Sequence, residues 1–139
     1  MSKYSKYEYI FAFCNQAVKQ ECPLMITEGN NIKDYIVEMY QENIGNKCIG
    51  VSTQEVLEDI PITSFCYDQH RVGDRIKVAL AGDVLIPRDS FINPSKIAPF
   101  RYIKPIDNGM WKVQKRRTKK SKGYILAFND THIKICLEF

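Results

Sequence analysis

The sequence predicts a mainly β fold, a small β-barrel or sandwich of about eight short strands with little helix and an N-terminal arm. Two segments, residues 75–86 and 133–139, alternate apolar and polar side chains with a period of two. Turn-forming clusters of Gly, Asn and Asp recur between the β-rich segments. The chain has 139 residues, of which 45% are hydrophobic and 26% charged, and this composition is typical of one domain with a buried core.

Residues 1–22 form the predicted N-terminal arm or short helix. Residues 8–20 could form a helix that buries Phe11, Cys14, Ala17 and Val18, or they could be extended. The periodicity of this segment does not decide between the two. In the extended alternative, five aromatic side chains would insert into a neighbouring surface: Tyr4, Tyr7, Tyr9, Phe11 and Phe13.

Residues 23–139 form the predicted single β-rich domain. In the strand over residues 75–86, Gly82 interrupts the apolar face, which predicts a bulge or a bend, and Pro87 closes the run. The pair Asn108-Gly109 predicts a tight hairpin with a type I′ turn. Further short strands are expected at residues 32–40, 48–51, 62–67, 100–103, 110–114 and 124–128.

One short helix is expected after a possible cap. The run Ser52-Thr53-Gln54-Glu55 matches the capping-box pattern, in which a hydroxyl and a carboxylate satisfy the first backbone N–H groups of a helix. It predicts one or two helical turns over residues 53–57.

The positive charge is concentrated in one segment. The formal net charge is +4, but without this segment the chain has 13 basic and 16 acidic residues. The segment, residues 112–122, has seven basic side chains and no acidic one: Lys112, Lys115, Arg116, Arg117, Lys119, Lys120 and Lys122.

Three interpretations of this basic segment stay open. It could be a flexible cationic loop that binds phosphates, with strong salt dependence. It could be a solvated hairpin loop between strands at residues 110–114 and 124–128, or it could dock on an acidic protein. Aromatic residues interleaved with the basic ones would favour nucleic acid, but only Trp111 and Tyr124 flank the segment.

The cysteines indicate packing rather than chemistry. The five cysteines are odd in number, widely spaced and without a C-x-x-C pair, so we expect reduced side chains in a chain that folds in a reducing cytosol. Cys66 and His70 could be drawn as a nucleophile and its base, which would make the chain a hydrolase, but no third orienting group accompanies them. We therefore predict a non-enzymatic protein with no catalytic site, metal or cofactor.

No membrane or export segment is expected. No apolar run approaches the roughly 20 residues of a spanning helix, and the first residues lack the apolar core of a secretory signal.

Several stretches, in order, resemble the capsid decoration (auxiliary, or head-stabilising) proteins of tailed bacteriophages. The resemblance covers residues 26 to 139, and its central block is residues 73–86. The stretches are Ile26-Thr27-Glu28-Gly29, Ile49-Gly50-Val51-Ser52-Thr53, residues 73–86, residues 102–109, Lys122-Gly123-Tyr124-Ile125-Leu126-Ala127 and residues 133–138.

The resemblance implies a β-rich virion protein that binds the major capsid protein and stabilises the shell. Such a protein would be made in the host cytoplasm, would lie on the capsid surface, and could associate with itself. The aromatic arm would then be the lattice anchor, because Tyr and Phe are good interface residues, or else part of the core. The alternatives are a nucleic-acid-binding barrel that uses residues 112–122, and a head-fibre, portal or tail component.

Overall fold

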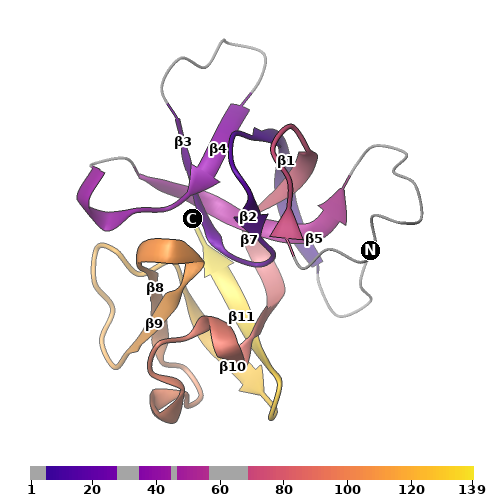
Figure 1. The fold of residues 1–139 in the computed structure, drawn as a ribbon. Coiled ribbons are helices and arrows are strands. Elements are labelled where there is room, and N and C mark those ends of the chain that lie inside the picture. The colour runs from indigo at the N-terminus through magenta and orange to yellow at the C-terminus, as the bar shows by residue number, and fades with distance from the viewer. Residues whose placement is uncertain (1–5, 28–34, 45–46, 57–68) are drawn as a thin grey trace.

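The structure is a computed structural model that describes residues 6–27, 35–44, 47–56 and 69–139. It is mainly β, as predicted (Figure 1). Its strands are β1 (Lys6–Cys14), β2 (Val18–Lys19), β3 (Pro23–Ile26), β4 (Tyr35–Met39), β5 (Cys48–Val56), β6 (Gln69–His70), β7 (Arg75–Pro87), β8 (Tyr102–Pro105), β9 (Trp111–Gln114), β10 (Gly123–Phe128) and β11 (His132–Glu138). Its 3-10 turns are η1 (Glu42–Ile44), η3 (Arg88–Ser90), η4 (Pro94–Lys96) and η5 (Asp107–Gly109).

The N-terminal half is a five-stranded barrel. Its strand order is β1-β4-β3-β5-β7, and antiparallel pairing of β7 with β1 closes it. The pairing of β1 with β4 is parallel, whereas the other pairs are antiparallel. Apolar side chains from the five barrel strands, from β2 and from the turn after β2 fill the interior, among them Ala12, Val18, Cys22, Leu24, Val37, Ile49, Ile76 and Val78.

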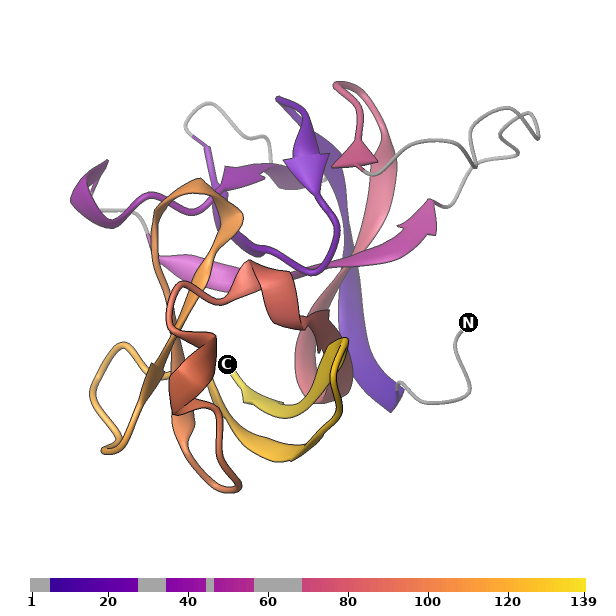
Figure 2. The same ribbon diagram turned by 60° about the horizontal axis from the view of Figure 1, so that its bottom comes forward.

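Strand β7 belongs to both halves of the molecule. Its first half pairs with β1 and β5, and its second half pairs with β11. Gly82 lies opposite both Tyr7 and Leu137. Its φ of 105° is one that residues other than glycine rarely adopt. The predicted irregularity at Gly82 is present as this positive φ, but β7 is one continuous strand there and not two short strands joined by a bend. In Figure 2, β1 (indigo) runs beside β7 (pink), and β11 (yellow) lies in the lower half of the view.

The second sheet continues in the order β7-β11-β10-β8-β9. Its core contains Val84, Ile86, Phe91, Ile103, Trp111, Val113, Ile125, Ile133, Ile135 and Leu137. The edge strand β9 is covered by Asn93, whose side chain accepts a hydrogen bond from the Val113 N–H (2.9 Å) and donates one to the Val113 carbonyl (3.0 Å). This amide takes the place of a further strand, so it protects the edge from pairing with another chain.

The two halves meet at the predicted Asn108-Gly109 turn. Both residues have positive φ, 61° and 71°, and the Met110 N–H donates to the Asp107 carbonyl (3.3 Å), so the turn prediction is confirmed. Lys19 of the barrel donates to the Asn108 carbonyl (3.2 Å). The fully buried Trp111 donates from its indole to the Glu21 carbonyl (3.1 Å).

Neither expected helix forms. Of the two alternatives for residues 8–20, the extended conformation is present and the helix is not, because strands β1 and β2 form there and alternate residues of β1 point into the barrel. The helix predicted over residues 53–57 is replaced by β5 as far as Val56. The buried Ser52 hydroxyl donates to the Lys19 carbonyl (2.6 Å) and the Thr53 hydroxyl to the Lys77 carbonyl (3.1 Å), so these hydroxyls join strands instead of capping a helix.

The predicted hairpin loop of the basic segment is also wrong. Strands β9 and β10 do not pair with each other, because β8 lies between them. The remaining predicted strands occur as β4, β5, β8, β9 and β10, whereas residues 62–67 lie outside the described residues. Within the described ranges, no helix is long and apolar enough to cross a membrane.

Candidate binding surfaces

The outer face of β1 presents a row of aromatic rings. Ala12 and Cys14 point into the barrel core, so Tyr9 and Phe11, at the alternate positions, lie on the outside. Tyr7 continues the row, but it is half-buried and packs against the core of the second sheet. The ring centroids of Tyr7 and Tyr9 are 6.1 Å apart, and those of Tyr9 and Phe11 are 5.4 Å apart. Tyr9 is 45% exposed and Phe11 40% exposed, which makes their rings accessible to a partner.

Two cations of β7 lie against this row. The Lys77 ammonium is 4.5 Å from the Tyr9 ring centroid, and the Arg75 guanidinium is 4.7 Å from that of Phe11. Each cation–π contact stabilises an exposed pair by about 0.5–1 kcal/mol. We call Tyr7, Tyr9, Phe11, Arg75 and Lys77 the aromatic–cation strip.

The strip contains three of the five predicted anchor residues. Phe13 continues the alternation on β1 and is half-buried, opposite Arg75. Tyr4 lies outside the described residues. The four described aromatic residues of the predicted arm therefore belong to a strand that is hydrogen-bonded to β7 and, at its end, to β4. Sequence reasoning missed Arg75 and Lys77, which only the β1–β7 register brings beside the rings.

The basic segment is exposed over most of its length. The exposed side chains are Lys112, Lys115, Arg116, Arg117, Lys119 and Lys120, whereas Lys122 is half-buried. Arg117 forms an ion pair with Glu138 of β11 (3.0 Å), and the Lys122 ammonium lies 5.5 Å from the ring centroid of Phe139. A turn between Thr118 and Ser121 is closed by a hydrogen bond from the Ser121 N–H to the Thr118 carbonyl (3.1 Å).

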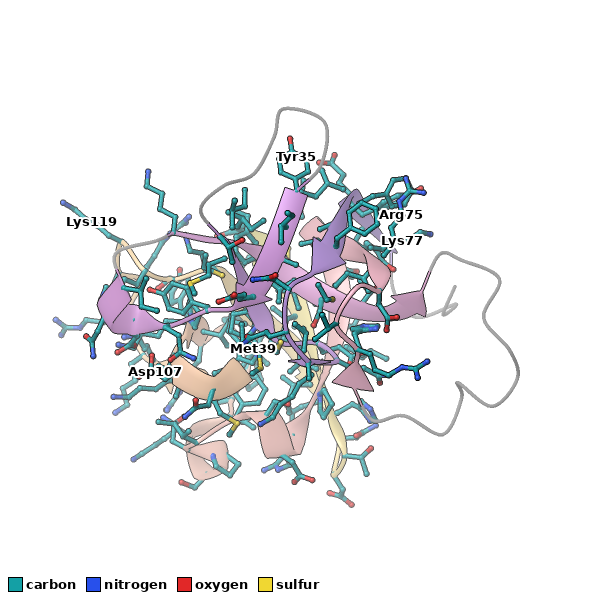
Figure 3. All side chains as sticks on the ribbon, turned by 45° about the horizontal axis from the view of Figure 1, so that its top comes forward. Tyr35, Met39, Arg75, Lys77, Asp107 and Lys119 are labelled. Atoms are coloured by element: carbon teal, nitrogen blue, oxygen red, sulfur yellow. The ribbon has the colours of Figure 1, made fainter. Side chains whose placement is uncertain are left out.

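The two surfaces are separate. In Figure 3, Lys119 of the basic segment lies on the opposite side of the molecule from Arg75 and Lys77 of the strip. One small partner cannot contact both at once, so each surface needs its own explanation.

His70 has a structural role in the barrel. It is 2% exposed, and its Nε2 atom lies at hydrogen-bond distance from the Thr53 carbonyl, so this nitrogen is the donor. Burial lowers the pKa of His70 and keeps the ring neutral, while the Thr53 hydrogen bond and Asp74 act in the opposite direction. Cys66 lies outside the described residues, so the structure does not test the Cys66–His70 alternative, which the sequence did not favour.

The described cysteines are free, and three of them are buried thiols. Burial raises the pKa of Cys14, Cys22 and Cys48 to about 12, so these thiols are protonated and unreactive at neutral pH. Cys136 is half-buried. Among the residues that the structure describes, no group of three or more His, Cys, Asp or Glu side chains is arranged to hold a metal ion.

Comparison with known proteins found no family model that matches the chain and no curated protein that matches it.

Proposed function

We propose that this chain is a non-enzymatic structural protein that attaches to a protein shell through the aromatic–cation strip and stabilises it. The accessible rings of Tyr9 and Phe11, each packed against a cation, are the observation that carries the proposal. The partner that the sequence resemblance implies is the major capsid protein of a tailed bacteriophage. The protein would then be made in the host cytoplasm and lie on the virion surface.

The strip is suited to adhesion because its rings are already ordered. Strand β1 is hydrogen-bonded to β7 along its length and to β4 at its end, which fixes the backbone under the rings. Binding through fixed aromatic side chains costs little conformational entropy, and each ring buries a large area. A partner must offer apolar pockets for the two rings and carboxylates near Arg75 and Lys77.

The proposal is tested by sedimentation with assembled shells. Shells of the major capsid protein encoded in the same genome, stripped of auxiliary proteins, are mixed with the purified chain at about micromolar concentration, a usual range for specific association. We expect the chain to sediment with the shells. Loss of binding by the double variant Tyr9→Ser, Phe11→Ser would support the strip as the anchor.

The matched control is Phe128→Ser. Phe128 is 44% exposed, close to the exposure of Tyr9, but it lies at the end of β10 in the second sheet. We expect this variant to bind like the unaltered chain. Failure of the unaltered chain to sediment with shells, or equal losses in both variants, would overturn the proposal. Imaging of bound particles separates a shell-wide protein from a head-fibre, portal or tail component.

A further inference from the structure

We propose that the outer face of the second sheet, with the basic segment folded beside it, binds single-stranded nucleic acid. This inference concerns a different face from the strip and does not depend on the shell proposal. It rests on two partly exposed tyrosines, Tyr102 and Tyr124, that the fold places next to the cations of residues 112–122.

The two tyrosines form a small aromatic platform. Tyr102 of β8 and Tyr124 of β10 are cross-strand partners, and their ring centroids are 6.5 Å apart with the planes at 70°. Their neighbours Ile103 and Ile125 are fully buried, so both tyrosines lie on the outer face. Flat rings on a sheet surface can stack with unpaired bases, whatever the sequence of the strand.

The fold brings the cations to this platform. Gln114, the last residue of β9, is the cross-strand partner of Tyr102 on its other side, and the exposed cations from Lys115 onward follow it immediately. The side chain of Gln114 accepts hydrogen bonds from Thr118 (3.4 Å) and Ser121 (3.5 Å). Arg117 reaches Glu138, which is on the outer face of β11 beyond β10. The segment is therefore held against the same side of the sheet as the tyrosines.

This face carries several cations that form no ion pair in the described part of the chain. Lys104 and Lys112 are cross-strand partners, and like charges in that position repel each other. Glu42 lies 3.8 Å from Lys104, whereas no carboxylate in the described part of the chain forms an ion pair with Lys112. Lys115, Arg116, Lys119 and Lys120 likewise have no ion pair there. Phosphates spaced along a strand would satisfy these cations and leave the bases free to reach the tyrosines.

Fluorescence anisotropy tests the inference. The probes are a labelled oligo(dT) of about 12 nucleotides, within the site sizes that small β-barrels cover, and a duplex of equal length. We expect tighter binding of the single strand. The logarithm of the association constant should fall linearly with the logarithm of the salt concentration. The slope should be about −0.7 for each phosphate that the protein contacts.

Charge variants test the basic segment. In the double variant Lys119→Gln, Lys120→Gln, the slope of log affinity against log salt should be shallower by about 1.4, because two phosphate contacts are lost. The matched control, Arg71→Gln with Lys96→Gln, removes two exposed cations that belong neither to the basic segment nor to strands β8, β9 and β10, and it should leave binding unchanged. Equal effects of the two double variants would overturn the assignment, because they would mean attraction by net charge alone.

Ring variants test the platform. Tyr102→Leu and Tyr124→Leu should each weaken binding of the single strand about tenfold, whereas Tyr102→Phe and Tyr124→Phe should retain it, because Phe keeps the stacking face. Thermal unfolding of each variant separates lost stacking from lost structure. Unchanged affinity in folded Leu variants would overturn the inference. Absence of oligo(dT) binding at low salt, or displacement of oligo(dT) by polyglutamate at equal charge, would also overturn it.

Discussion

The two candidate surfaces are built by different parts of the backbone. In the barrel half, the aromatic–cation strip lies on strands β1 and β7, whose backbones pair from Lys6 to Phe13. In the second half, the ends of the basic segment are paired, through β9 with β8 and through Lys122 with the backbone of Ile103 and Glu138. Residues 115–121 between these ends pair with no strand. A local turn, side-chain hydrogen bonds to Gln114 and the Arg117–Glu138 ion pair hold them. A rigid surface suits a partner of fixed shape, whereas a cationic segment suits a polyanion that can adapt. Four predictions test this contrast, from the largest expected effect to the smallest.

Replacing Trp111 should have the largest effect, because this residue joins the two halves. Trp111→Ala removes a fully buried side chain and the donor to the Glu21 carbonyl. We expect a loss of about 3–5 kcal/mol in the free energy of unfolding, measured in urea. Trp111→Phe should cost less, since it keeps most of the buried ring. A loss below about 1 kcal/mol for the Ala variant would mean that Trp111 does not couple the halves.

Gly82→Ala tests whether the irregularity in β7 supports both surfaces. An alanine at a φ of 105° is strained, and we expect a loss of about 1–3 kcal/mol. Hydrogen exchange should show weaker protection of the β1–β7 and the β7–β11 pairs. Gly73→Ala is the comparison, because Gly73 also has positive φ (87°) but precedes β7. The idea of a shared irregularity fails if Gly82→Ala loosens only one of the two sheets.

Acid should weaken the barrel half through His70. Its pKa is lowered in the folded chain, so below the ordinary value of about 6.5 the unfolded chain binds a proton that the folded chain does not. This contribution to stability is therefore complete above pH about 6.5 and is lost as the pH falls below it. Urea unfolding at pH values from about 7.5 to 5 measures the slope. The slope should be smaller in His70→Gln, and an equal slope would assign the acid sensitivity to other groups.

The smallest effects distinguish the contacts of the two surfaces. Double-mutant cycles on Lys77 with Tyr9 and on Arg117 with Glu138 should each give a coupling of at most about 1 kcal/mol. Added salt should reduce the Arg117–Glu138 coupling more, because both partners carry a net charge and are partly exposed, whereas the Tyr9 ring has none. A larger effect of salt on the Lys77–Tyr9 coupling than on the Arg117–Glu138 coupling would contradict the contrast between the two surfaces.

The second half was more predictable from sequence than the barrel. Its alternating segments and its turn at Asn108-Gly109 are local signals, because residues two apart share a face and an Asn-Gly pair favours one turn type. In the barrel, Ser52 and Thr53 match a local helix-capping pattern. However, their hydroxyls bond to the carbonyls of Lys19 and Lys77, which are distant in sequence. Pairing partners so far apart override local preference.

Prediction of the two candidate surfaces from the sequence had the same limit, because contacts between distant residues were missed. The sequence identified the aromatic residues of β1 and the basic residues of 112–122, because both are clustered along the chain. It did not reveal which cations lie beside the rings, because the β1–β7 register sets that. Trp111 was considered for stacking but is fully buried, and Tyr102 takes the place beside Tyr124. Alternation around Ile103 would have placed Tyr102 on the outer face.

The central claim is that the chain binds through two independent surfaces, and crossed binding of two variants tests it most directly. Tyr9→Ser with Phe11→Ser alters the strip, and Lys119→Gln with Lys120→Gln alters the basic segment. Each variant is assayed against assembled shells by sedimentation and against oligo(dT) by anisotropy. The account predicts that the first loses only the shells and the second is weakened only toward oligo(dT). Parallel losses of both partners in either variant would contradict it.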